Sequence, residues 1–186
     1  MKIGFIVEGA TEKIILEKSD LFDLLKEKNI EFIPEIIDAE GGGNLLPHNI
    51  IPYSQTLTDK GATVILILTD LDEEQCITKT KTRIGSSEQQ IICLSIKTIE
   101  AWFLADRNAM RNFLSDKDFD CATPETVADP FLFIKDLRLQ RSNRGVADKK
   151  ILAKLMIKSG FTIKKAADHP HCLSAQYFLK KVTELI

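Results

Sequence analysis

The chain has 186 residues, of which 44% are hydrophobic and 28% are charged, an ordinary composition for a globular protein. This length allows one domain with a substantial core and a small extension. No segment approaches the roughly 18 apolar residues that a membrane span requires, and Glu8 comes too early for a secretory signal. We therefore expect a cytoplasmic protein with no membrane partner.

The net charge of −2 hides an uneven distribution. Residues 135–186 contain 12 Lys and Arg against 4 Asp and Glu, a local charge of +8, which leaves −10 for residues 1–134. A basic flank beside an acidic segment is typical of a protein that binds a polyanion next to a metal site. The alternative is that most of these lysines form the solvated faces of ordinary helices.

The first predicted element is an apolar strand over residues 2–7, and the letters EGATE follow it directly. Thr11 is a suitable N-cap, and apolar residues then recur on one helical face until about residue 28. We expect one helix over this stretch.

Two glutamates flank the start of this helix. Glu8 would lie at the strand tip and Glu12 in the first helical turn, and Gly9 permits the tight turn that brings both carboxylates to one point. The alternative is that Glu12 only complements the helix dipole.

A second strand is predicted over 31–37, followed by a glycine-rich loop at 41–44. The loop is not followed by the Lys-Ser/Thr pair of a nucleotide-binding P-loop, so we interpret it as a segment that lets the chain pass near the site. A weaker helix, interrupted by Pro47 and Pro52, is predicted over 45–59.

The third strand is the most informative segment, because five consecutive apolar residues, 64–68, run into a cluster of acids. Such a run predicts a buried central strand of a parallel sheet, and ligands of these sheets bind beyond the carboxyl ends of the strands. Asp70 and Asp72 would point the same way from an extended backbone and would repel unless a cation or a shared proton intervenes. Alternatively, Asp70 caps the next helix while Asp72 and Glu73 complement its dipole.

Residues 73–83 are predicted to form a polar helix or loop, and residues 90–96 a fourth strand. A helix over 97–106 follows, with Glu100 in its first turn and Trp102 as a core anchor. The alternation of strands and helices predicts a three-layer α/β fold, with a parallel sheet of about four strands and right-handed crossovers.

The remainder is less regular. Residues 107–144 show no clear period, and helical periodicity returns over 149–158 and 174–186. We therefore expect a core domain at 1–106 and a mainly helical extension at 107–186 that packs on the same domain.

Cysteine and histidine give little sign of a zinc site. The HPHC letters at 169–172 lack a second pair of ligands, so a structural turn is the preferred interpretation. The four cysteines have no paired spacing and predict reduced thiols.

Three motifs together resemble Toprim domains, namely VEGATE at 7–12, LTDLDEE at 68–74 and IEAWFLAD at 99–106. Toprim domains occur in topoisomerases, primases and the overcoming-lysogenization-defect nucleases. The resemblance is strongest to an uncharacterised Toprim-like family with a Glu-Ala-Trp motif, often encoded beside ATPases in bacterial defence loci. It covers about residues 2–106 and implies a Toprim-like fold and a separate ATPase subunit as a partner.

In the nuclease branch that the motifs resemble, two glutamates four residues apart, the DxD pair and a later acid bind metal ions. The resemblance therefore implies Mg²⁺ or Mn²⁺, with room for two ions. The implied metal ligands are Glu8, Glu12, Asp70, Asp72 and Glu100. The implied catalytic residues are Glu8, Asp70, Asp72 and a distant lysine, placed at Lys149 or its neighbour Lys150.

The physical chemistry of phosphodiester cleavage agrees with this assignment. Oxygen-only ligands favour Mg²⁺ or Mn²⁺, and two such ions about 3.5–4 Å apart stabilise the attacking and leaving oxygens of an in-line displacement. A lysine near the scissile phosphate would neutralise transition-state charge. We expect metal-dependent cleavage or nicking of DNA or RNA, with the basic segment at 135–186 holding the phosphate backbone.

Two other classes of function stay open. The domain could be a non-catalytic Toprim-like module that binds partners or acts as a sensor. It could also be a phosphatase-like enzyme whose first DxD aspartate becomes phosphorylated, although that pair usually follows the first strand and here follows the third.

Overall fold

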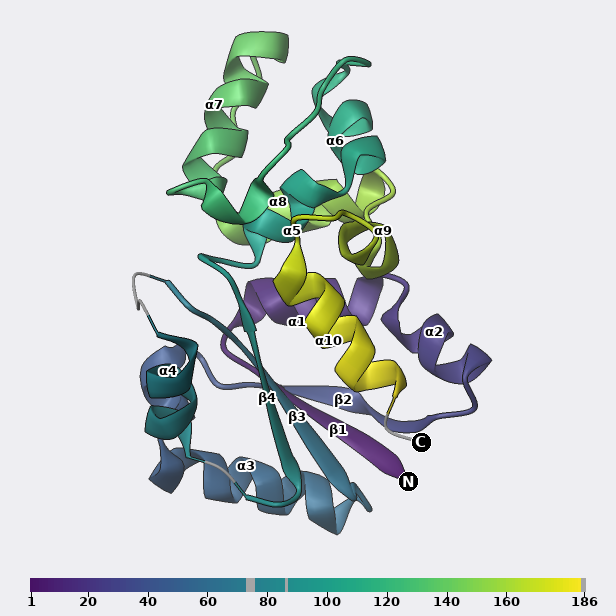
Figure 1. Cartoon of the computed structure of the whole chain (residues 1–186), viewed down its shortest axis with the longest axis vertical. Coiled ribbons are helices and arrows are strands. Elements are labelled where there is room, and N and C mark those ends of the chain that lie inside the picture. Colours follow the sequence, from purple (N-terminus) through teal and green to yellow (C-terminus); the bar gives the residue numbers. More distant parts are fainter. Residues whose placement is uncertain (73–75, 86, 185–186) are drawn as a thin grey trace.

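A computed structural model describes residues 1–72, 76–85 and 87–184, and a parallel four-stranded sheet lies at its centre (Figure 1). The strands have the spatial order β2-β1-β3-β4, and every neighbouring pair is parallel. Their bounds are Lys2–Val7 for β1, Glu31–Asp38 for β2, Val64–Asp70 for β3 and Gln90–Ser95 for β4. The prediction of a four-stranded parallel sheet is confirmed, and the strands that lead into Glu8 and Asp70 are neighbours.

Helices cover both faces of the sheet. One face carries α3 (Pro47–Asp59) and α4 (Ile77–Ile84), and the other carries α1 (Ala10–Lys18), α2 (Leu21–Glu27) and α10 (Leu173–Thr183). This three-layer arrangement explains why the first five residues of β3 are all apolar, because side chains on both of its faces are buried. Leu66 and Leu68 pack toward α1, while Ile65 and Ile67 pack toward α3.

The other helices form a layer beyond the carboxyl ends of the strands, in the upper part of Figure 1. They are α5 (Glu100–Ala105), α6 (Arg107–Leu114), α7 (Pro130–Ser142), α8 (Lys149–Lys158) and α9 (Ile163–Ala167), with a short 3-10 helix at Pro124–Thr126 (η2). A second 3-10 helix, Gly42–Leu45 (η1), follows β2 and contacts α3. Apolar residues of this layer and of the sheet belong to one continuous hydrophobic cluster. Within the described ranges, every helix is too short or too polar to cross a bilayer.

The N-terminal helix differs from the prediction in two respects. It begins at Ala10 with Gly9 as the N-cap, so Thr11 lies inside the first turn. The single helix expected until about residue 28 is divided into α1 and α2. Asp20, at the break, accepts hydrogen bonds from the backbone N–H groups of Ile163 (2.7 Å) and Lys164 (3.2 Å), and so caps the start of α9 from a distant part of the chain.

The stretch that showed no clear period contains two well-capped helices. Asp106 accepts a hydrogen bond from Ala109 N at the start of α6, and Asp129 accepts one from Leu132 N at the start of α7. The second helix also has Pro130 at its first position, where the missing N–H would have no partner in any case.

Candidate metal centre

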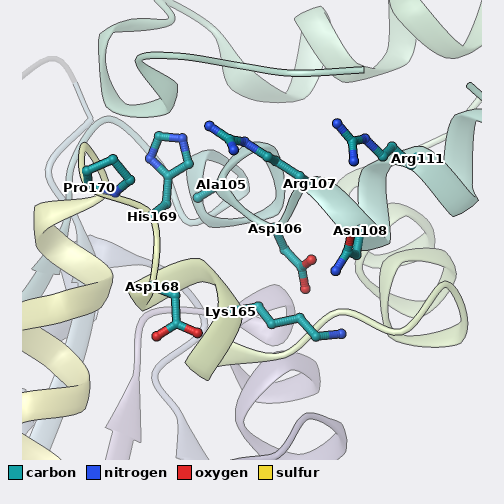
Figure 2. Close-up of a pocket in the computed structure, with 9 residues that line it drawn as sticks. All are labelled: Ala105, Asp106, Arg107, Asn108, Arg111, Lys165, Asp168, His169 and Pro170. Atoms are coloured by element: carbon teal, nitrogen blue, oxygen red, sulfur yellow. The ribbon is translucent and has the colours of Figure 1, made fainter. Parts of the chain in front are cut away.

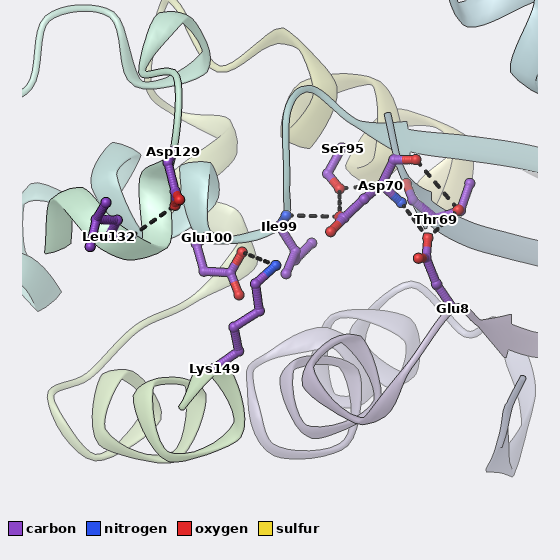
Figure 3. A network of polar contacts seen from close by, with 9 residues as sticks. All are labelled: Glu8, Thr69, Asp70, Ser95, Ile99, Glu100, Asp129, Leu132 and Lys149. Carbon is purple, nitrogen blue, oxygen red and sulfur yellow. Dashed lines mark hydrogen bonds and ion pairs between the residues drawn. The ribbon is translucent and has the colours of Figure 1, made fainter. Parts of the chain in front are cut away.

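Acidic side chains from four parts of the chain gather where the strands end, and Figure 3 shows three of them, Glu8, Asp70 and Glu100. Glu8 directly follows β1, Asp70 ends β3, Glu12 lies in the first turn of α1, and Glu100 begins α5. Because parallel strands place their carboxyl ends at one edge, the order of the sheet brings these positions together.

Glu8 bridges the two central strands. Its Oε2 accepts hydrogen bonds from Thr69 Oγ1 (2.5 Å) and from the backbone N–H of Asp70 (3.0 Å). The glycine-rich loop passes directly over this carboxylate, as expected: Gly41 N donates to Glu8 O (2.8 Å), and a Cβ atom at Gly42 would lie 3.1 Å from Glu8 Oε1. The sequence GGG therefore permits a close approach of the loop to the acid.

Asp70 fixes the start of the helix that carries Glu100. Its Oδ1 accepts hydrogen bonds from Ser95 Oγ and from the backbone N–H of Ile99 (2.8 Å). The alternative prediction was that Asp70 caps the helix that follows it along the chain. Asp70 does cap a helix, but that helix is α5. Sequence reasoning missed Ser95 and Thr69, although each is a polar residue at the end of an apolar strand.

Asp72 lies beyond the strand, so the expectation that it points the same way as Asp70 from an extended backbone is wrong. The strand ends at Asp70, and Asp72 has a left-handed backbone (φ 48°) and an exposed side chain. Its backbone N–H donates to Lys97 O (2.7 Å), in the segment that follows β4. Partial burial and then the Glu8 carboxylate still raise the pKa of Asp72. Glu73 lies outside the described residues.

Glu100 is the most deeply buried acid, with no exposed surface. Within the described part of the chain, neither of its carboxylate oxygens has a hydrogen-bond partner. Its charged neighbour is Lys149, the first residue of α8, whose Nζ lies 3.4 Å from Glu100 Oε2. Of the two lysines considered, Lys149 is therefore the one at the acid cluster, while Lys150 is exposed.

Crowding of these acids shifts their proton affinities. Burial, together with repulsion from Glu100 and Glu8, raises the pKa of Glu12 from 4.5 to about 7 against the opposing effects of its own backbone N–H and Lys149. Burial and the neighbouring Glu12 raise the pKa of Asp70 well above its usual value. Burial lowers the pKa of Lys149, but the attraction of Glu100 and Asp70 outweighs it and leaves the pKa raised. The cluster thus carries repulsion that one lysine only partly offsets.

The donor set fits a divalent cation in its chemistry. The available donors are carboxylate oxygens, which Mg²⁺ and Mn²⁺ prefer, and the two oxygens of Glu100 are buried without hydrogen bonds. Across the described ranges, no three acidic, His or Cys side chains already converge at ligand distance on one point. Binding an ion would therefore require side chains of the cluster to turn toward it.

Two pockets open beside the acid cluster, and Lys149 lines both. One has a volume of about 790 Å³ and is also lined by Asp72, Lys97 and Phe131. The other has a volume of about 510 Å³ and is also lined by Thr11. Lys149, the cation beside the buried acids, is thus reached from both pockets.

A further polar pocket of about 360 Å³ lies at the opposite end of α5 and contains none of the predicted site residues (Figure 2). His169 lines it and makes structural contacts: its Nε2 lies 3.0 Å from Cys121 O, and its Nδ1 accepts a hydrogen bond from His171 N. These contacts support the interpretation of residues 169–172 as a structural turn.

The sheet order and the covering helices define a three-layer α/β fold with a parallel sheet, and acids lie at the carboxyl edge of that sheet. No family model matches the chain, and no curated protein matches it. Among solved structures, the chain is similar to the C-terminal region of the Burkholderia pseudomallei OLD protein, with a TM-score of 0.51 and 15% identity, over 98% of this chain and 97% of that chain. OLD abbreviates overcoming lysogenization defect. The likeness extends through residues 107–186 and shows a shared fold.

Proposed function

We propose that the chain is a Toprim-type nuclease module that cleaves or nicks nucleic acid with the help of Mg²⁺ or Mn²⁺. The observation that carries this proposal is the convergence of acids from β1, α1, β3 and α5 around a buried Glu100 that is paired with Lys149. The fold shared with an OLD protein supports the same class of activity.

The proposed metal ligands are Glu8, Glu12, Asp70, Asp72 and Glu100. A bound cation would supply positive charge for the attacking and leaving oxygens of the phosphodiester. Lys149 is half-exposed and positively charged at neutral pH, and it lines both pockets, so its Nζ can meet a phosphate oxygen there. Asp70 orients α5, and through it Glu100, by holding the Ile99 N–H.

Nucleic acid is the proposed substrate, and a separate ATPase subunit of a bacterial defence system is the proposed partner. The basic residues at 135–186 are divided among α7, α8, α9 and α10, apart from Arg144, which lies between α7 and α8. Lys149 and Lys150 of α8 are the ones that border the pockets beside the acids. Contacts to the phosphate backbone predict affinity that falls steeply with salt and depends little on sequence.

The direct test is incubation with supercoiled plasmid and Mn²⁺, using wild type, Asp70→Asn and Asp59→Asn. Asparagine keeps an acceptor for Ser95 Oγ and Ile99 N, so Asp70→Asn removes the charge without removing the cap. We expect wild type to nick the plasmid and Asp70→Asn to be at least about 100-fold slower, as for loss of a metal ligand.

Asp59 is the matched control because it ends α3, away from the carboxyl edge of the sheet, and its conversion to Asn should leave nicking unchanged. Equal nicking by wild type and Asp70→Asn would show that the site is misplaced. Binding of protein partners without any nucleic-acid binding or cleavage would favour the non-catalytic module instead.

A further inference from the structure

The pocket of about 790 Å³ beside the acid cluster is lined by residues of two chemical kinds. We call it the Phe131 pocket. The apolar residues of its lining, here called the apolar wall, are Leu71, Ile96, Ala128, Pro130 and Phe131. The polar and charged residues, here called the polar side, are Asp72, Lys97, Thr98, Asp129 and Lys149. The lining thus combines an aromatic ring with two lysines and two aspartates, and a ligand that has both a flat ring and a negative charge can contact the ring and the lysines.

Phe131 is held firmly enough to act as a fixed surface. It lies in the first turn of α7, whose start is fixed by Pro130 and by the hydrogen bond from Leu132 N to Asp129 (2.8 Å). Its side chain is partly buried and packs against the main hydrophobic cluster, while the remainder lines the pocket. A ring that is already ordered loses little freedom when another ring stacks on it.

The polar side of the pocket is built on unusual backbone. Asp72 (φ 48°) and Lys97 (φ 62°) both adopt the left-handed conformation, and Asp72 N donates to Lys97 O (2.7 Å). Residues other than glycine rarely adopt this conformation, and such positions concentrate at functional sites. Here the turn places Lys97 in the lining of the pocket together with Asp72.

We propose that the Phe131 pocket holds one unpaired nucleotide of the substrate strand. Its base lies against Phe131 and the apolar wall, and its phosphate lies toward Lys97 and Lys149, beside the acids. The base of a duplex is stacked on both faces and cannot reach such a ring without leaving the stack. The inference rests on the proposed function and makes it more specific: the substrate is single-stranded, or has an unpaired nucleotide at the site of cleavage.

The test is a binding measurement that does not depend on cleavage. A short DNA or RNA single strand with phosphorothioate linkages and one 2-aminopurine base is titrated with the protein in Mn²⁺, beside a blunt duplex of the same sequence. Stacking on Phe131 should quench the fluorescence of the base, and the single strand should bind at least about tenfold more tightly than the duplex.

Three variants identify the ring that is responsible. Phe131→Leu keeps an apolar side chain against the core and should bind the single strand about tenfold more weakly, with loss of quenching. Phe131→Trp should retain both. Phe133→Leu is the matched control, because Phe133 lies on the same helix, is 40% exposed and does not line the pocket.

The outcomes separate this inference from the proposed function. Equal affinity for single strand and duplex, or equal binding by Phe131→Leu and Phe133→Leu, would overturn the pocket assignment even if wild type nicks plasmid. Wild type could show quenching that requires Phe131 and yet fail to cleave a single strand with ordinary phosphodiester linkages. This result would support the pocket assignment and overturn the nuclease proposal. Absence of quenching with wild type would overturn the pocket assignment outright.

Discussion

Replacing Glu12 with glutamine should stabilise the metal-free protein by about 2–3 kcal/mol more near pH 8 than near pH 5. The reason is that the folded protein raises the pKa of Glu12 from 4.5 to about 7, chiefly through burial and then through Glu100 and Glu8. Between these two values the folded state binds more protons than the unfolded state, so the stability of wild type falls as pH rises from about 4.5 to 7. Glutamine has no charge to bury, so the variant lacks this fall.

The measurement is thermal or urea unfolding of both proteins in chelator across this pH range. Glu17→Gln is the control, because Glu17 belongs to the same helix but lies outside the buried acid cluster and should show little change at either pH. A constant stability difference between wild type and Glu12→Gln from low to high pH would show that Glu12 does not bear a buried, destabilising charge.

Replacing Lys149 with methionine should destabilise the metal-free protein by about 2–3 kcal/mol near pH 7. The substitution removes the cation 3.4 Å from Glu100 and leaves a fully buried carboxylate among other acids. Breaking a fully buried pair costs about 3–5 kcal/mol, and the lower value is expected here because the Lys149 side chain is 44% exposed and water screens the pair.

Two comparisons identify the cause of this loss. Adding Glu100→Gln to Lys149→Met should recover part of the stability, because the uncompensated charge is then absent. Lys150→Met changes the next, exposed residue of α8 and should alter stability by less than about 0.5 kcal/mol. If the two lysine variants are equally stable, the ion pair between Lys149 and Glu100 is not a stabilising contact.

The parallel sheet and the proximity of most of the acidic side chains could be predicted from the sequence, because both follow from the order of apolar runs and acidic residues along the chain. Three of the strands, β1, β3 and β4, contain short apolar runs, and the run at 64–68 indicates burial on both faces. Since parallel strands end at one edge, the positions of Glu8, Asp70 and Glu100 along the chain were sufficient to bring them together. The burial of Glu12 also agrees with a tight turn after β1.

Features that depend on contacts between distant segments could not be predicted. The break after α1 and the start of α9 depend on one aspartate, Asp20, that reaches Ile163 across the fold. The turn at Asp72 depends on the carbonyl of Lys97 in another strand connection. The helical periodicity of α7 could not be recognised in the sequence, because apolar residues such as Leu139 remain exposed on this helix. Asp129 followed by proline was nevertheless a local signal for the start of the helix.

The central claim is that the acids at the carboxyl edge form a divalent metal site, and titration calorimetry with Mn²⁺ tests it most directly. The comparison is between wild type and the double variant Asp70→Asn, Asp72→Asn, which keeps acceptors for the Ser95 and Ile99 contacts. Relief of repulsion should stabilise the metal-free variant whether or not the acids bind metal, so stability alone does not decide. We predict a saturable heat of binding for wild type that disappears in the variant; identical heats for the two proteins would contradict the claim.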